Sequence, residues 1–213
     1  MCQIRDGWMV FDDWSNEPLS NVVFPTGIQK IRFGRVFNQN VSQLPNSLTH
    51  LIFGWKFNQD MRNALPNSII HLTFGYCFNK DVSNLPNSIT YLTFGRSFNQ
   101  DVSNLPNSIT HLIFDWKFNQ DTRNLPNSLT YLKFGYCFNQ NISKLPKSIT
   151  YLKFSGWIDS KFNHNLNPYL YHLTDFYITD SHKQKRLMVE RCQTNTHNIS
   201  IREDKLIDLL LKN

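Results

Sequence analysis

Proline returns at a nearly fixed interval through most of this chain. Successive copies stand 20 positions apart, with one step of 21, at Pro25, Pro45, Pro66, Pro86, Pro106, Pro126 and Pro146. Each opens a near copy of one unit, such as PNSLTHLIFGWKFNQDMRNAL at 45–65. A unit this short cannot bury an apolar face alone, so stacked copies must bury it together. The period predicts a repeat solenoid with seven units over residues 25–154.

Four columns of the aligned units are apolar and form the predicted core. The aliphatic columns are Ile28, Leu48, Ile69, Ile89, Ile109, Leu129 and Ile149, and Ile31, Leu51, Leu72, Leu92, Leu112, Leu132 and Leu152. The phenylalanine columns are Phe33, Phe53, Phe74, Phe94, Phe114, Phe134 and Phe154, and Phe37, Phe57, Phe78, Phe98, Phe118 and Phe138. In LTHLIF, alternate residues point to opposite sides, which predicts one short strand per unit.

The residue after each strand is usually glycine, at Gly34, Gly54, Gly75, Gly95 and Gly135, with Asp115 and Ser155 as exceptions. We expect a tight turn there with φ > 0, which glycine adopts freely and Asp tolerates better than most residues. Too few residues then remain before the next proline for a helix. The back of each coil is therefore predicted to consist of turns or a 3₁₀ stretch.

An asparagine follows the second phenylalanine of each unit, at Asn38, Asn58, Asn79, Asn99, Asn119 and Asn139. A side-chain amide repeated in every coil can bond the backbone of its own turn and of the next. We interpret this column as a buried structural ladder, and not as a catalytic one. The aspartates Asp60, Asp81, Asp101 and Asp121 repeat with the fold and are interpreted as turn residues.

The repeated frame [LF]P-x-S-[LI]-x-x-L-x-F-G-x-x-F-N resembles the FNIP repeat, which is known from amoebae and from large viruses that infect them. The frame P-x-S-L-x-x-L-x-F also resembles short leucine-rich repeats. The resemblance implies a leucine-rich-repeat-like β-solenoid with a parallel sheet, used for interaction. Some relatives carry an amino-terminal F-box that links them to ubiquitin ligases. Only 24 residues precede the first unit here, which is too few for that module.

The segments outside the repeats are predicted to be caps. Residues 1–24 contain Trp8, Met9, Val10, Phe11 and Trp14, enough to cover the first coil. Residues 155–213 begin with a degenerate repeat, followed by a mostly helical cap. Ser200 and Glu203 have the spacing of a capping box before the apolar segment 206–211, which predicts a terminal helix. A dimer contact or a partner helix is the alternative for that segment.

Composition limits location and redox chemistry. The chain has 213 residues and a formal charge of +6, with −3 in residues 1–24, +8 in 25–154 and +1 in 155–213. No secretory signal or membrane-spanning apolar stretch is visible, so we expect an intracellular protein, cytoplasmic or nuclear, without membrane contact. Cys77 and Cys137 stand three coils apart, about 14 Å, too far for a disulfide. We expect free thiols and a monomer.

No enzyme motif is present, so we expect a protein without catalytic residues or cofactors. The sequence has no phosphate-binding glycine loop, no metal-spaced Cys/His set and no nucleophile elbow. His50, His71 and His111 share the outward column of the predicted strands. Lys30 and tyrosines fill the same column and no carboxylate joins it. We interpret the histidines as part of a surface row and predict no metal site.

Core packing does not determine the residue type at the outward positions of the strands or in the turn after each strand. Aromatic residues and arginine, which are enriched at interface hot spots, gather there, and the candidate binding residues are Trp55, Tyr76, Tyr91, Arg96, Trp116, Tyr131 and Tyr136. We expect them to form one continuous strip. Tyr and Thr also favour strands, which is the structural alternative.

The turn positions also follow a longer period of three units. Trp55, Tyr76 and Arg96 are followed by Trp116 and Tyr136, which indicates duplication of a three-unit block. The sequence therefore predicts a non-enzymatic scaffold for a protein partner, with a host factor as one candidate. The alternative is a nucleic-acid-binding solenoid, because aromatic residues beside Lys and Arg also suit bases and phosphates. A purely structural or multimeric role is the third possibility.

Overall fold

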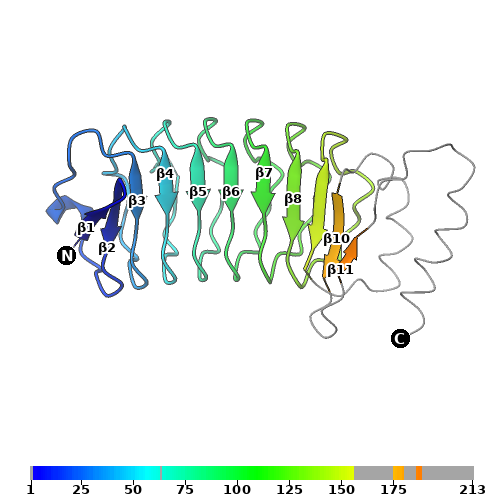
Figure 1. Cartoon of the computed structure of the whole chain (residues 1–213), viewed down its shortest axis with the longest axis horizontal. Helices are drawn as coiled ribbons and strands as arrows, with labels where there is room; N and C mark the ends of the chain where they lie inside the picture. The colour runs from blue at the N-terminus through cyan, green and yellow to red at the C-terminus, as the bar shows by residue number, and fades with distance from the viewer. Residues whose placement is uncertain (1, 63, 156–174, 180–185, 189–213) are drawn as a thin grey trace, which may run out of the picture.

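The chain forms an elongated β-solenoid, seen in a computed structural model that describes residues 2–62, 64–155, 175–179 and 186–188 (Figure 1). Its strands form one sheet in which spatial order equals chain order. They are β1 (Cys2–Arg5), β2 (Trp8–Phe11), β3 (Lys30–Arg32), β4 (His50–Ile52), β5 (His71–Thr73), β6 (Tyr91–Thr93), β7 (His111–Ile113), β8 (Tyr131–Phe134), β9 (Tyr151–Phe154), β10 (Asp175–Thr179) and β11 (Arg186–Met188). The predicted parallel β-solenoid is confirmed.

Pairing within the sheet is parallel from β2 to β10. Equivalent residues of adjacent coils are partners, as for His50 with His71 and Leu51 with Leu72. The hairpins β1–β2 and β10–β11 at the two ends are antiparallel. This strict register is what places every column of the sequence in a straight row along the solenoid.

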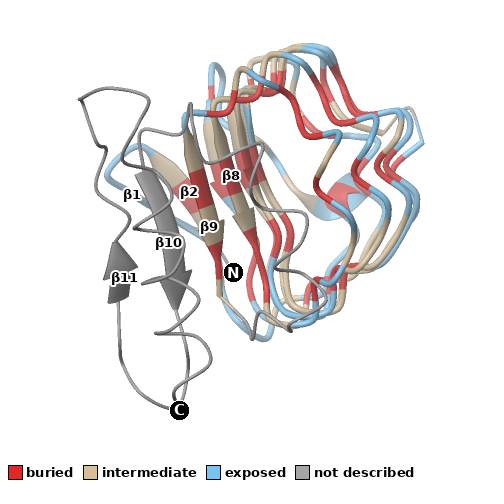
Figure 2. Cartoon of the chain, turned by 90° about the vertical axis from the view of Figure 1, so that its right-hand side faces the viewer, coloured by how far each residue is buried: buried red, intermediate tan, exposed pale blue. Residues whose placement is uncertain are grey.

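The core is a stack of aliphatic and phenylalanine columns enclosed by the coil (Figure 2). The middle residue of each short strand is buried, while the residues beside it face outward. The two phenylalanine columns interleave: the rings of Phe53 and Phe57 lie 3.7 Å apart between centroids, and Phe53 lies 5.6 Å from Phe74 of the next coil. All four predicted core columns are buried.

The back of each repeat consists of turns, one of the two alternatives that the sequence predicted. Typical turn bonds are Leu48 N–H to the Pro45 carbonyl, at 3.1 Å, and Leu44 N–H to the Val41 carbonyl, at 3.3 Å. Among the described residues the 3₁₀ segment is η1 (Leu19–Asn21), which precedes the first repeat. The aspartates of the back edge are turn residues, since Asp81 Oδ1 accepts from Ser83 N–H at 2.9 Å.

The glycine column has a different cause from the one expected. Among the described residues, φ is positive at Gly7, Gly27 and Asp6, and not in the column after the strands. A Cβ at Gly54 would instead overlap the Gly34 carbonyl of the preceding coil, and a Cβ at Gly75 would overlap the Gly54 carbonyl. Close approach of adjacent backbones therefore requires glycine here, and the prediction of φ > 0 was wrong.

The asparagine column is a ladder, as predicted. From Asn38 to Asn119, the side-chain oxygen of each asparagine in the column accepts a hydrogen bond from the backbone N–H of the equivalent asparagine in the next coil, as between Asn79 and Asn99 at 2.9 Å. Asn16 adds a rung before the first repeat, because its Oδ1 accepts from Asn38 N–H at 2.8 Å. The rungs are half-buried or exposed, so the expectation of a buried ladder was wrong.

The two ends differ in how much is described. β2 continues the sheet beyond the first repeat, and Met9, Phe11 and Leu19 extend the core. At the other end, β10 and β11 lie within the segment 155–213 that was predicted to be a degenerate repeat and a mostly helical cap. The predicted helix with Ser200, Glu203 and residues 206–211 lies outside the described residues.

Candidate binding surface

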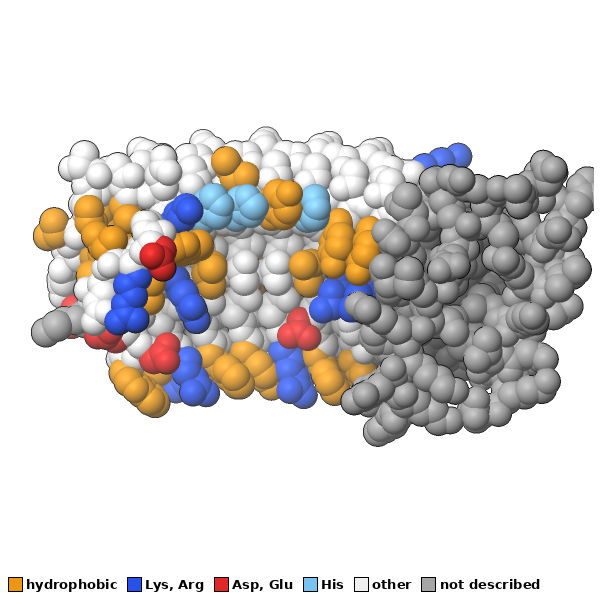
Figure 3. Space-filling view, viewed as in Figure 1, with side chains coloured by type: hydrophobic (Ala, Val, Ile, Leu, Met, Phe, Trp, Pro, Cys, Tyr) orange, Lys and Arg blue, Asp and Glu red, His pale blue; other side chains and the backbone are white. Residues whose placement is uncertain are grey.

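Aromatic rings stack in a line along the outer face of the sheet (Figure 3). We call this line the strand row, and its members are the first residues of six successive strands, His50, His71, Tyr91, His111, Tyr131 and Tyr151. Neighbouring ring centroids lie 4.2–4.3 Å apart, except for 5.5 Å between His111 and Tyr131. Trp8 meets His50 edge-on at 6.0 Å, with Lys30 Nζ 5.9 Å from the Trp8 ring.

A second line, the turn row, lies where the chain leaves each strand, and its members are Arg35, Trp55, Tyr76, Arg96, Trp116 and Tyr136. Trp55 stacks on Tyr76 at 4.2 Å, and Trp116 stacks on Tyr136 at 4.5 Å. The Arg96 guanidinium lies between these pairs, 5.5 Å from the Tyr76 ring and 4.4 Å from the Trp116 ring. Arg35 lies 5.2 Å from the Trp55 ring, so cations and rings alternate along the row.

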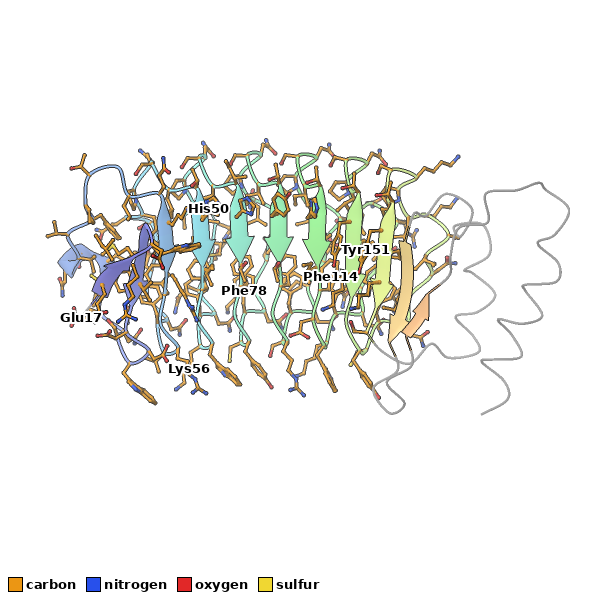
Figure 4. All side chains as sticks on the ribbon, in the orientation of Figure 1. Glu17, His50, Lys56, Phe78, Phe114 and Tyr151 are labelled. Atoms are coloured by element: carbon orange, nitrogen blue, oxygen red, sulfur yellow. The ribbon has the colours of Figure 1, made fainter. Side chains whose placement is uncertain are left out.

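The two rows are separate, which corrects the expectation of one continuous strip. Tyr91 and Tyr131 belong to the strand row, whereas the other five candidate residues belong to the turn row. Figure 4 shows the separation through His50 in the upper part of the outer face and Lys56 at its lower edge. The position along the coil explains it, because the turn row lies five residues after the strand row and an extended chain advances about 3.3 Å per residue.

Between the rows lies the middle row, formed by the third residue of each strand from β3 to β9: Arg32, Ile52, Thr73, Thr93, Ile113, Lys133 and Lys153. Figure 3 shows its centre as a band of small side chains and backbone, with larger side chains towards both ends. At the amino-terminal end a shallow hollow of about 260 Å³ lies over Gly54 and Gly75, lined by Arg32, Ile52 and Trp55 among others.

Exposure distinguishes three of the candidate residues. Trp55, Tyr91 and Trp116 keep 43%, 41% and 38% of their surface exposed, while the other four are half-buried by their neighbours. Single exposed apolar side chains are normal on a protein surface, but several of them aligned on one face are uncommon and mark interaction sites. Their ring faces, however, are covered by the rings or guanidinium groups of adjacent coils, so the rows present ring edges to solvent.

Burial lowers the pKa of all three histidines of the strand row. His71 and Lys30 lower the pKa of His50 further, and His111 lowers that of His71. Thr49 Oγ1 lies 2.9 Å from His50 Nδ1, and Thr110 Oγ1 lies 2.9 Å from His111 Nδ1. The imidazoles are therefore neutral at pH 7, and hydroxyls of the preceding residues orient two of them.

The stacked histidines are poorly arranged to share a metal ion. The planes of His50 and His71 are within 8° of parallel, and imidazole lone pairs lie in the ring plane. They therefore do not converge on one point. In the part of the chain that the structure describes, no group of three His, Cys, Asp or Glu residues could hold a metal ion. Cys2, Cys77 and Cys137 are free thiols.

Comparison with known families adds an independent observation. Four stretches match the model of the FNIP repeat family, at residues 40–77, 78–115, 101–137 and 118–156. Together they cover residues 40–156, which is more than half of the chain. The chain belongs to the FNIP repeat family. No curated protein matches it. Within the residues described, no helix of this FNIP repeat protein is long and apolar enough to cross a membrane.

Two features of the FNIP coils escaped the sequence analysis. From the second to the sixth unit, the serine two residues after the proline bonds the preceding coil, as Ser88 Oγ donates to the Ile69 carbonyl at 2.6 Å. The recurrence of this serine in every unit after the first was the available signal. Arg35 was not among the candidate binding residues, because only the structure shows its guanidinium on the Trp55 ring.

Proposed function

We propose that this FNIP repeat protein is a non-enzymatic scaffold that binds another protein through the outer face of its sheet. The observation that carries the proposal is the alignment of Trp55, Tyr91 and Trp116, each exposed, in two stacked rows on one face. Stacking holds these side chains in place before a partner arrives, so little side-chain entropy is lost on binding. Aromatic residues and arginine in such positions supply most of the energy of typical interfaces.

The repeat architecture supports the non-enzymatic part of the proposal. Catalytic groups with different tasks need different environments, whereas the phenylalanine and asparagine columns here each repeat one residue type in one environment. Asp60 and Asp121 pair with the arginines two residues later, and Asp81 and Asp101 bond their own turns. These aspartates are thus engaged in structure. We also propose a monomer as the binding unit.

Nucleic-acid binding remains the second candidate because cations lie beside the rings, with Arg35 and Arg96 in the turn row and Lys133 and Lys153 in the middle row. Single-stranded nucleic acids bind aromatic residues by stacking bases on free ring faces. Here the faces within both rows are occupied by neighbouring coils at about 4.2 Å, which disfavours base stacking. Phosphate contacts alone would give binding that falls steeply with salt.

The test is capture of proteins from host-cell lysate by the whole chain, with and without nuclease. Replacing Tyr91 and Trp116 together by alanine should abolish specific capture and lower the melting temperature only slightly, because both side chains lie outside the core. The matched control replaces Asn84 and Asn104, which are exposed on the back edge. Capture that survives the Tyr91/Trp116 pair but disappears with nuclease, or with Lys133 and Lys153 neutralised, would favour nucleic acid.

A further inference from the structure

The turn row is built from one triad that occurs twice. Arg35, Trp55 and Tyr76 form the first copy, and Arg96, Trp116 and Tyr136 form the second. The contacts repeat as well as the residues. Each arginine lies against the ring of its tryptophan, at 5.2 and 4.4 Å, and each tryptophan stacks on its tyrosine, at 4.2 and 4.5 Å. Two equivalent surfaces therefore stand three coils apart on one edge of the sheet.

The arginine of the second triad is held in a fixed orientation. Rings approach its guanidinium from both sides, Tyr76 from the preceding coil and Trp116 from the next. A guanidinium stacked in this way keeps its N–H edge free to point away from the rings, and that edge matches a carboxylate in two parallel hydrogen bonds. Among the described residues, the ion pairs are Arg62 with Asp60 and Arg123 with Asp121, so Arg96 has no carboxylate partner there.

Charge on this face is one-sided. The strand, middle and turn rows contain five arginines and lysines and no aspartate or glutamate. Acids that adjoin the rows are Asp13, whose Oδ1 accepts from Arg35 N–H at 3.3 Å, and Asp12 and Asp115 at positions equivalent to the column glycines. The other aspartates of the repeats lie on the back edge in their own turns. A partner that covers the outer face therefore needs to bring acidic groups.

The spacing of the triads defines the shape of that partner. Three coils separate Arg35 from Arg96 by about 14 Å. In an extended segment, residues four positions apart lie on one face and are separated by about 13 Å. A helix returns to the same face after eleven residues, at about 16.5 Å, which is a poorer match. The hollow over Gly54 and Gly75 leaves room beside the first triad for a side chain of the segment.

We propose that the two triads read a pair of carboxylates on one extended, acidic segment of the partner protein, with Arg35 and Arg96 each binding one carboxylate. This inference rests on the proposed function, because it names the chemistry of the protein partner. The segment runs along the solenoid, across the strands. Its acidic residues stand four positions apart, and its other side chains contact the middle row.

The experiment selects random linear peptides, displayed on phage, on the immobilised whole protein. Enriched peptides should carry two acidic residues four positions apart. Synthetic copies should lose about tenfold or more in affinity when Arg35 or Arg96 is replaced by glutamine. Arg96→Lys should lose nearly as much, because lysine keeps the charge but not the planar fork. Arg123→Gln, on the back edge, is the matched control and should leave affinity unchanged.

Moving the two acidic residues of a synthetic peptide to a spacing of two or six should also weaken binding about tenfold, since one chain can then reach only one triad. Enriched peptides without an acidic pair, or binding that ignores both Arg96→Gln and the spacing, would overturn the inference. If peptides of that kind still fail to bind the variant in which Tyr91 and Trp116 are alanine, the proposed scaffold function stands and only the carboxylate-pair inference falls. An oligothymidylate that binds with the same arginine dependence would overturn the inference in favour of nucleic acid. Failure to enrich any peptide, together with lysate capture that ignores the Tyr91/Trp116 pair, would overturn both proposals.

Discussion

Each asparagine of the ladder binds, through its side-chain oxygen, the backbone of the coil that follows it. Asn99 Oδ1 accepts from Asn119 N–H at 2.8 Å and from Gln120 Nε2 at 3.1 Å, so one side chain satisfies two donors. The backbone N–H of Asn99 in turn donates to Asn79 Oδ1 of the preceding coil, at 2.9 Å. Because the rungs are half-buried or exposed, water can partly replace a lost bond. The ladder therefore sets the stacking geometry of the coils more than it adds stability.

Replacing Asn99 by alanine should lower the free energy of unfolding by about 1 kcal/mol, the net value of a typical hydrogen bond that solvent can partly replace. Urea unfolding followed by circular dichroism measures it. Asn84→Ala, whose amide bonds only the neighbouring Ser83 hydroxyl, should shift the midpoint much less. Equal midpoints for the two variants would show that the ladder contributes nothing to stability.

Thr122 stands in a core column with a buried hydroxyl that has no hydrogen-bond partner. The column otherwise holds Val41, Met61, Val82, Val102 and Ile142, all buried. Replacement by valine keeps the shape and removes the unsatisfied hydroxyl, so Thr122→Val should stabilise the fold by about 1 kcal/mol.

The control for Thr122→Val is Thr110→Val, because the Thr110 hydroxyl contacts the Thr90 carbonyl at 3.3 Å and the His111 ring at 2.9 Å. It should be neutral or destabilising. Urea midpoints that rise for Thr110→Val and not for Thr122→Val would contradict this account of the buried hydroxyl.

At the scale of the single coil, three kinds of cross-coil contact hold one strand and its turns against the next. Backbone pairing, hydroxyl and amide bonds, and ring stacking all follow the same register. The sequence predicted the strand, the core columns, the asparagine ladder and the turn aspartates, because each depends on a residue type repeated at one position. The reason for the glycine column was missed. The close approach of Gly54 to the Gly34 carbonyl involves two coils, and the sequence of one unit does not distinguish it from a turn that needs glycine. The division of the candidate residues into two rows was missed because it depends on where the strand ends.

Gly75→Ala should destabilise the protein by about 1–3 kcal/mol, because its Cβ would overlap the Gly54 carbonyl and the two coils would have to move apart. Thermal and urea unfolding measure the loss. Asp115→Ala is the comparison in the same column: it already carries a Cβ, so its substitution should cost little. A Gly75→Ala protein as stable as the parent would show that neighbouring coils separate without cost.

Stability should fall as pH drops from 7 towards 5. The folded-state pKa values of His50, His71 and His111 are lowered by burial, so below the ordinary value of about 6.5 the unfolded chain binds more protons than the folded one. The stabilisation is complete above that pH and is lost as pH falls through the lowered pKa values. Urea midpoints at a series of pH values measure it.

A variant with His50, His71 and His111 replaced by glutamine is the control for the pH series and should show a flatter profile in this range. Asp81 and Asp101 do not interfere, because hydrogen bonds to Ser83 and Ser103 lower the pKa of these carboxyls below their ordinary range. The same slope in both proteins would assign the pH dependence to other groups.

Across the whole molecule, each coil contacts the coils before and after it, because the order of strands in the sheet is the order in the chain. Stability is then close to a sum of coil terms and interface terms. Nothing in this arrangement fixes the number of coils. The Leu-Pro step between units recurs unchanged, so two units can be joined at any pair of these steps.

Deleting residues 66–125 removes three whole units and joins Leu65 to Pro126. We expect the shortened chain to fold, with a lower free energy of unfolding and a smaller dependence on urea concentration, in proportion to the surface lost. It keeps one triad, made of Arg35, Trp55 and Tyr136. Circular dichroism and urea unfolding test this. A control deletion of 66–75 breaks the register and should not fold; equal behaviour of the two deletions would argue against independent coils.

The three-coil period also determines how such a molecule can grow. An inserted block of three units adds about 14 Å of length and one further Arg–Trp–Tyr triad, in step with those already present. The length of the solenoid and the number of triads therefore increase together, by one triad for each added block of three units. A longer solenoid would therefore bind a longer ligand with the same three residue types, and no new kind of side chain would be needed.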